Sequence, residues 1–254
     1  MRTILFEASI FAVAAFAAFA QLSEKAAEFD AASVKLSAAG PEGRPRGRIT
    51  ETPGRLSIVS MQLRPIVAWA YHVQPSQVSG PSSLETEWYD IIATTTSGGG
   101  QEQLRQMLRR LLQDRFKLAF RRKTQALPAY VLTRPKGTSK LRESTEAGET
   151  GTDAGGQAMI NIKRATVAQF AQLLSNPLKS PVVDMTGLKG LYDFKLDIVP
   201  YIEGGVRDGV DDRKLDIPDI VSQAIQDQLG LKLELRKVPI EVLVVEHVER
   251  PSPN

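Results

Sequence analysis

One pattern of apolar and polar residues occurs twice in this chain, and the repetition constrains its fold more than any other feature. Residues 54–73 show alternating apolar positions, followed at once by apolar residues at helical spacing. Residues 158–175 repeat this order. Each segment predicts a strand that leads directly into an amphipathic helix. Ser60 is the expected N-cap of the first helix, and Thr166 marks the corresponding corner in the second.

The residues that follow each segment also match. In both halves a tyrosine–aspartate pair precedes an apolar strand, at Tyr89–Asp90 and at Tyr192–Asp193. A second amphipathic helix then follows, over residues 101–116 in the first half and 216–230 in the second. The correspondence therefore extends well beyond a single motif.

An alternating strand follows each second helix, and a loop ending at Pro128 or Pro239 precedes a last strand. The sequence thus predicts an α+β fold made of two tandem copies of a β-α-β-β-α-β-β unit, with helices packed on mixed or antiparallel sheets. We expect a first unit with an extra N-terminal strand over 21–142, a flexible linker over 143–157 and a second unit over 158–254. The copies could form two domains or one pseudo-twofold domain.

The first twenty residues predict a signal peptide. Arg2 precedes an uninterrupted apolar or small run from Ala8 to Ala20, and small residues stand before the expected cleavage after Ala20. We therefore expect an exported protein, periplasmic or extracellular, with no transmembrane span after cleavage. An uncleaved anchor or a buried helix are the alternatives for residues 1–20.

The chain contains no cysteine. This excludes disulfides, cysteine-ligated zinc or iron–sulfur sites, thiol nucleophiles and a lipid-modified N-terminal cysteine. An exported chain of 254 residues must then be stabilised by its apolar core, and it is long enough to form one. The formal net charge of +3 does not by itself imply a polyanionic partner.

Asp184 and Asp193 are the candidate acid pair of this sequence, and they could serve a hydrolase or bind a cation. The alternative is that both belong to a turn between strands, where aspartate is common. Asp90 occupies the place of Asp193 in the first half, which favours the structural interpretation. His72 and His247 have no ligand partners at metal-binding spacing. We assign no catalytic, cofactor-binding or metal-binding residue and expect no cofactor.

Basic residues gather between the second helix of the first unit and the strand after it. A possible anionic-surface site consists of Arg105, Arg109, Arg110, Arg115, Arg121, Arg122 and Lys123. These residues could bind a polyanion or the envelope surface, attract the more acidic second copy or a partner protein, or simply form a solvated helix face. Nucleic acid is not an expected partner, because the chain is expected to be exported and aromatic residues are sparse in this region.

Several motifs resemble a family of exported proteins that is expanded in soil bacteria and has no established function. They are "FDAASVKLS", "VSGPSSLETEWYDI", "MLRRLLQDRFKLAFRRKTQALPAYVL", "VVDMTGLKGLYDF" and "AIQDQLGLKLELRKVPIEVLVVEHVERPSPN". The family is sometimes fused to sensor-type membrane metallopeptidases, and it supplies no catalytic residues to transfer. A fainter similarity, of pattern alone, is to the short N-terminal domains of secretins and TonB-dependent receptors, which are periplasmic interaction modules.

These observations favour an exported, non-enzymatic interaction or binding module of the cell envelope, with an envelope protein or an anionic surface as its partner. The alternatives are a polyanion binder that uses the basic residues and a hydrolase that uses Asp184 and Asp193.

Overall fold

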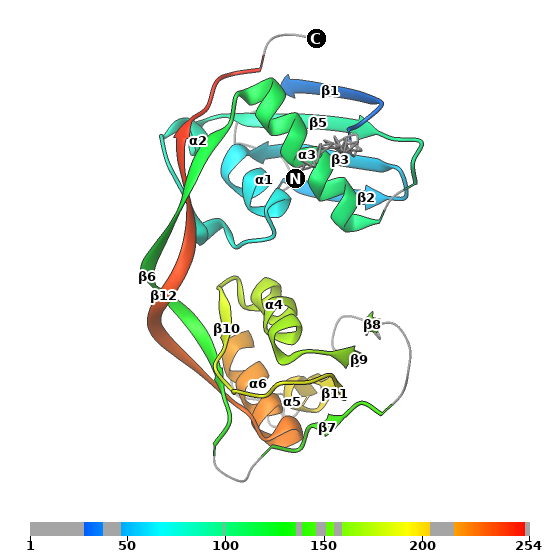
Figure 1. Ribbon diagram of the computed structural model, residues 1–254, viewed down its shortest axis with the longest axis vertical. Helices are drawn as coiled ribbons and strands as arrows, with labels where there is room; N and C mark the ends of the chain where they lie inside the picture. Colours follow the sequence, from blue (N-terminus) through cyan, green and yellow to red (C-terminus); the bar gives the residue numbers. More distant parts are fainter. Residues whose placement is uncertain are drawn as a thin grey trace, which may run out of the picture.

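The computed structural model describes residues 28–37, 47–98, 100–135, 139–145, 151–154, 159–203 and 216–251. The predicted signal, residues 1–20, lies outside them. The described chain forms two lobes joined by a long ribbon of two strands (Figure 1). The predicted α+β class is confirmed, since helices accompany three four-stranded sheets. Within the described ranges, no helix is long and apolar enough to cross a membrane.

The first lobe is an antiparallel sheet packed against helices. Its strands, in spatial order, are β1 (Ala31–Leu36), β5 (Trp88–Thr94), β3 (Arg55–Gln62) and β2 (Arg48–Thr52). Its other elements are α1 (Leu63–Ala70), the 3₁₀ turn η1 (Pro75–Gln77), the short strand β4 (Val78–Ser79), α2 (Ser83–Thr86) and α3 (Gln101–Phe116). The predicted N-terminal strand is confirmed as β1, which occupies an edge of the sheet beside β5.

The second lobe has the same kinds of elements. Its sheet order is β7 (Arg142–Glu143), β11 (Tyr192–Asp197), β9 (Met159–Ala165) and β8 (Gly151–Ala154). Its other elements are α4 (Val167–Leu178), β10 (Val182–Asp184), α5 (Val199–Glu203), α6 (Ile217–Ala224) and a π-helical turn, η3 (Ile225–Leu229). Part of the predicted linker thus differs from expectation, because β8 and the end of β7 pair at the edges of this sheet.

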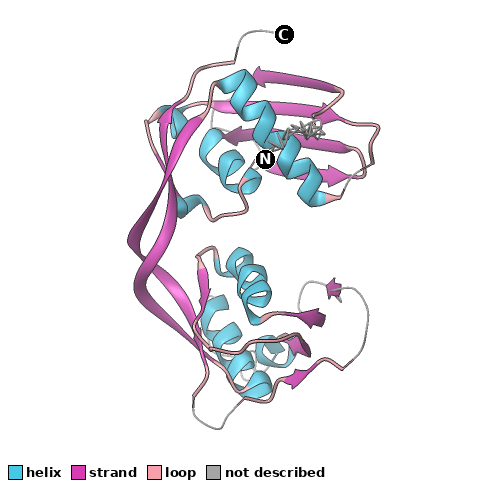
Figure 2. Cartoon of the chain, in the orientation of Figure 1, coloured by secondary structure: helices cyan, strands magenta, loops and turns pink. Residues whose placement is uncertain are grey.

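The ribbon corrects the prediction of two short strands at the end of each unit. β6 (Ala119–Thr133) and β12 (Lys232–His247) are single long strands, paired antiparallel along their whole length (Figure 2). Pro128 lies opposite Lys237, and Pro239 lies opposite Ala126. Each strand of a two-stranded ribbon has one free edge, where a proline removes no ladder bond. The two prolines therefore do not interrupt the strands.

The long strands also exchange ends between the lobes. The last part of β12 pairs in parallel with β4 of the first lobe, and the last part of β6 pairs in parallel with β10 of the second. Leu243 and Val245 are accordingly buried in the core of the first lobe, while Leu132 is buried in the core of the second. A smaller apolar cluster lies on the ribbon between them. The lobes therefore do not coincide with the predicted division of the chain at residues 143–157.

In each lobe a β-bulge with a left-handed residue lies at the end of the strand that leads into a helix, at the end of β3 before α1 and at the end of β9 before α4. Ser60 and Arg164 have left-handed backbone conformations, with φ of 48° and 53°. Each lies where the register to the neighbouring strand shifts by a bulge. Ser60 is therefore not the N-cap of α1, which is Gln62. Thr166, in contrast, caps α4 with its side chain and forms a capping box with Gln169.

Candidate functional site

A cleft of about 520 Å³ lies between the two lobes. The first lobe contributes Glu51, Ala68, Trp69, His72, Val73, Gln74, Gln101 and Arg105. The second lobe contributes Ala165, Gln169, Gln172, Leu173 and Asn176. This volume is in the range of sites for small molecules and short peptide segments. We refer to it as the interlobe cleft.

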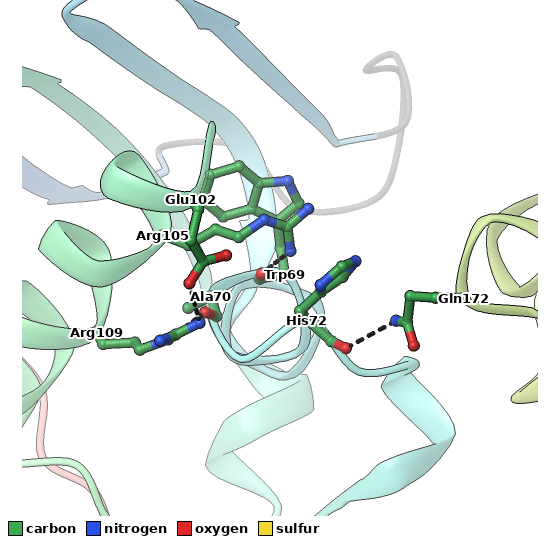
Figure 3. A network of polar contacts seen from close by, with 7 residues as sticks. All are labelled: Trp69, Ala70, His72, Glu102, Arg105, Arg109 and Gln172. Atoms are coloured by element: carbon green, nitrogen blue, oxygen red, sulfur yellow. Dashed lines mark hydrogen bonds and ion pairs between the residues drawn. The ribbon is translucent and has the colours of Figure 1, made fainter. Parts of the chain in front are cut away.

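Among the described residues, two side-chain hydrogen bonds connect the lobes across this cleft. The amide of Gln172 donates to the carbonyl oxygen of His72 over 3.0 Å, as Figure 3 shows. The amide of Gln74 donates to Oδ1 of Asn176 over 3.2 Å. Bonds between neutral amides and carbonyls each contribute only about 0.5–1.5 kcal/mol net. These two bonds therefore contribute little to holding the lobes together across the cleft.

The first-lobe wall is built on the C-terminal end of α1, where helix carbonyls lack partners within the helix. Arg105 Nη1 donates to the carbonyl oxygen of Trp69 over 2.5 Å, and Arg109 Nε donates to that of Ala70 over 2.6 Å. Both arginines come from α3, one helical turn apart (Figure 3). A cation at a helix C-terminus is also favoured by the helix dipole. The two arginines thus fix α1 against α3.

The two arginines differ in their charge balance. Arg109 forms an ion pair with Glu102 over 3.1 Å, and its guanidinium lies 5.4 Å from the ring centroid of Tyr71. Arg105 is only 6 % exposed and lies over the ring of Trp69 at 4.7 Å. It has no ion pair within the described residues. Burial lowers the pKa of the Arg105 guanidinium, which remains charged.

His72 adds a neutral polar group to the cleft. It follows α1 with φ of 54°, a left-handed conformation that histidine adopts more readily than most residues. Burial lowers the pKa of its imidazole, and the charge of Arg105 lowers it further. Its pKa therefore lies below the usual value near 6.5, so the ring is neutral at pH 7 and can both donate and accept a hydrogen bond.

The second-lobe wall is one face of α4. Gln169, Gln172, Leu173 and Asn176 follow one another at helical spacing, so they line the same side of the helix. The opposite side of α4 is buried in the core of the lobe through residues such as Phe170. The amphipathic pattern that anchors α4 therefore also presents its amides to the cleft.

The lining can bind polar groups of several kinds. The part of it that the structure describes contains five amide side chains, one imidazole, one guanidinium, one carboxylate and one indole ring. Among the described residues, no group of three or more histidine, cysteine, aspartate or glutamate side chains is placed to hold a metal ion. This lining resembles a recognition surface, in which amides and a charge orient the ligand and an aromatic ring packs against it.

The predicted basic site does not form one continuous surface. On α3, Arg105 and Arg109 turn toward α1, whereas Arg110 bonds Asp114 over 2.7 Å and lies 3.5 Å from Glu28. Arg115 lies beside a separate hollow near the start of β1. The helix therefore divides its arginines between different neighbours.

The remaining basic residues lie on the ribbon. Arg121 pairs with Glu246 over 2.8 Å, and Arg122 pairs with Glu241. Lys123 lies opposite Val242 in the ladder. The two ion pairs join basic residues of β6 to acidic residues of β12. Attraction between the basic segment and the more acidic second copy was one of the alternatives considered from the sequence. Exposed pairs of this kind contribute little to stability, at most about 1 kcal/mol each.

Asp184 and Asp193 have separate local partners. Asp184 Oδ1 accepts hydrogen bonds from the backbone and hydroxyl of Thr186, at 2.9 and 2.7 Å, and so closes a turn. Asp193 Oδ1 accepts from the backbone N–H of Arg164 over 2.7 Å. This bond lowers the pKa of Asp193. Neither residue lines the interlobe cleft.

Asp90 plays the same part in the first lobe as Asp193 in the second. Its Oδ1 accepts from the backbone N–H of Ser60 over 2.6 Å. In both lobes an aspartate after a buried tyrosine therefore holds the left-handed residue of the bulge. This geometry favours the structural interpretation of the tyrosine–aspartate pairs.

Sequence reasoning assigned no role to Trp69, Gln172 or the other cleft amides, because they come from segments far apart in the chain. One local signal was present. Arg105 lies among buried positions of α3, beside Leu104 and Leu108, and an arginine there must find a partner inside the protein.

Comparison with models of known protein families identifies the family of this chain. Residues 64–248 match the model of a family described as "Protein of unknown function (DUF3738)". The chain belongs to this family. The match begins in α1 and ends just after β12, so it includes the whole ribbon and every residue named in the cleft lining except Glu51. No match was found among curated proteins or among solved structures.

Proposed function

We propose that this family member is an exported, non-enzymatic binding module of the cell envelope that holds its ligand between its two lobes. The observation that carries the proposal is the interlobe cleft, whose walls come from α1 and α3 on one side and α4 on the other. A site divided between two lobes joined by a ribbon is a common arrangement for ligand capture.

The geometry supports this function better than the two alternatives. A polyanion binder requires unpaired cations on one face, yet Arg109, Arg110, Arg121 and Arg122 all have acidic partners. A hydrolase built on Asp184 and Asp193 requires carboxylates that are free to act on a substrate, and both are engaged by backbone groups.

Export and gene duplication belong to the same proposal. Export is supported by the apolar stretch before Gln21. Duplication is supported by the parallel order of elements in the two halves and by the matching bonds of Asp90 and Asp193. The exchanged ends of β6 and β12 would then make the copies one folding unit.

A cleft-blocking variant tests the proposal. Gln101 lines the cleft at the start of α3, so Gln101→Trp is expected to obstruct it while leaving the fold intact. Gln106→Trp makes the same change on an exposed position of the same helix, outside the cleft lining, and serves as the matched control.

The measurement is affinity capture from the envelope fraction of the host by immobilised residues 21–254. We expect Gln101→Trp to retain at most about one tenth of the material that the unmodified chain and Gln106→Trp retain, because the indole fills the cleft and the ligand cannot enter it. Equal retention by all three proteins would contradict binding in the cleft. If captured material is lost only when Arg121→Ala and Arg122→Ala are introduced, the result would support a polyanion binder instead.

A further inference from the structure

Arg105 is the most unusual group of the interlobe cleft. Its side chain is almost completely buried, yet within the described residues its only hydrogen bond is to the carbonyl oxygen of Trp69. The carboxylate of Glu51 is engaged by Gln101, and that of Glu102 by Arg109. Taking a charge out of water is unfavourable unless an opposite charge and further hydrogen bonds compensate.

The end of α1 compensates only in part. A helix C-terminus acts as about half a negative charge. The guanidinium has five N–H groups, and one of them is used by Trp69. Arg105 lines the cleft, so an anion entering it would meet a cation that has no direct ion pair within the described residues and that has unused donors.

We infer that the ligand of the interlobe cleft carries a carboxylate that binds Arg105, and that this carboxylate is the C-terminus of a peptide or protein. The inference rests on the proposed function and names the chemistry of its ligand. A guanidinium matches the two oxygens of a carboxylate through parallel hydrogen bonds.

The charges around the cleft favour a monoanion over a phosphate. Among the described residues of the lining, Arg105 is the only lysine or arginine, and Glu51 lines the same cleft. The carbonyl end of α1 also faces Arg105. A dianion would meet one cation and these negative groups, so an anion of single charge, such as a carboxylate, is the better match.

The amide side chains favour a peptide over a simple organic acid. Gln172 uses its N–H₂ group toward His72, and Asn176 uses its carbonyl oxygen toward Gln74. Among the described contacts, the oxygen of Gln172 and the N–H₂ group of Asn176 have no other partner. One accepts and one donates, which is what a peptide group in an extended chain requires.

The volume and the tryptophan fit the same ligand. About 520 Å³ is enough for a few residues of peptide. Trp69 lies partly exposed at the cleft, with Arg105 over its ring, and offers an apolar surface to a side chain of the ligand. A free small carboxylate would share the contact with Arg105 but not the contacts with the amides.

Trp69 also supplies the test, since the chain has only two tryptophans. In Trp88→Phe, Trp69 is the only indole, and its fluorescence reports occupancy of the cleft. The probes are trialanine with a free C-terminus, trialanine amide and succinate. We expect trialanine to bind at least about tenfold more tightly than its amide, since hydrogen bonds between charged groups are the stronger kind.

The outcomes separate the sources of the carboxylate. Binding of succinate but not of trialanine would overturn the peptide assignment and identify a small organic acid. No carboxylate-dependent change with either probe would overturn the inference as a whole. The capture experiment with Gln101→Trp judges the proposed function independently, because it does not depend on the chemistry of the ligand.

A variant pair isolates the role of Arg105. Arg105→Gln is expected to abolish the preference for the acid over the amide, whereas Arg110→Gln, on the same helix, should retain it. Because Arg105 also caps α1, folding of the variant is checked by thermal unfolding. If Arg105→Gln does not fold, the comparison of trialanine with its amide on the protein that keeps Arg105 still decides whether the ligand is bound through a carboxylate.

Discussion

Replacing Leu243 with alanine is expected to loosen the first lobe, although this residue belongs to the second half of the chain. Leu243 is only 1 % exposed, and its side chain packs in the core formed by β1, β3, β5, α1 and α3. Its neighbour in the sheet is Val78 of β4. Loss of a buried leucine leaves a cavity and lowers the free energy of unfolding by about 2–5 kcal/mol.

The reciprocal substitution is Leu132→Ala. This residue is fully buried in the core of the second lobe, although it belongs to the first half of the chain. Hydrogen exchange should therefore quicken mainly in β5 for Leu243→Ala and mainly in β9 for Leu132→Ala. Two autonomous tandem domains would give the opposite assignment, each substitution affecting the lobe of its own half.

The second large effect is expected at the aspartate that follows Tyr89. Asp90→Ala removes the acceptor for the backbone N–H of Ser60, a residue that is 5 % exposed. A buried donor left without a partner costs about 1–3 kcal/mol. The left-handed conformation of Ser60 would also lose the bond that holds it. Denaturant unfolding should show this loss.

Asp90→Asn is the control, because its amide oxygen can still accept the bond and should preserve most of the stability. Asp193→Ala should act in the same direction on the second lobe, through the N–H of Arg164. In both lobes the capture of envelope material should fall only with the loss of folded protein. A variant that folds normally but loses function would instead favour an active-site role for these acids.

Local patterns in the sequence predict the elements well. Alternation and helical spacing locate β3, α1, β9 and α4, and the corner expected at Thr166 coincides with the start of α4. The structural interpretation of the tyrosine–aspartate pairs also agrees with the bonds of Asp90 and Asp193. Such signals depend on neighbours within a few residues.

The ribbon could not be predicted in the same way. Pro128 and Pro239 are ordinary signals for a strand boundary, yet each lies inside a strand whose other edge is open. Whether a strand stays within its unit or crosses to the other lobe depends on long-range pairing. The partners of Leu132 and Leu243 are therefore fixed by tertiary structure and not by local pattern.

Apart from Arg105, the residues of the candidate site were missed for the same reason. The basic residues were grouped by their nearness in sequence, but α3 and the ribbon direct them to different neighbours. Trp69, Arg105 and Gln172 come together only when the two lobes face each other across the cleft. Charge density along a chain does not reveal which cations are already paired.

Hydrogen–deuterium exchange of residues 21–254, with and without the captured envelope ligand, tests the central claim most directly. If the ligand lies between the lobes, exchange should slow in both walls together, over residues 68–74 and 169–176. Slower exchange in one lobe alone, or along the ribbon at residues 121–123, would contradict binding in the interlobe cleft.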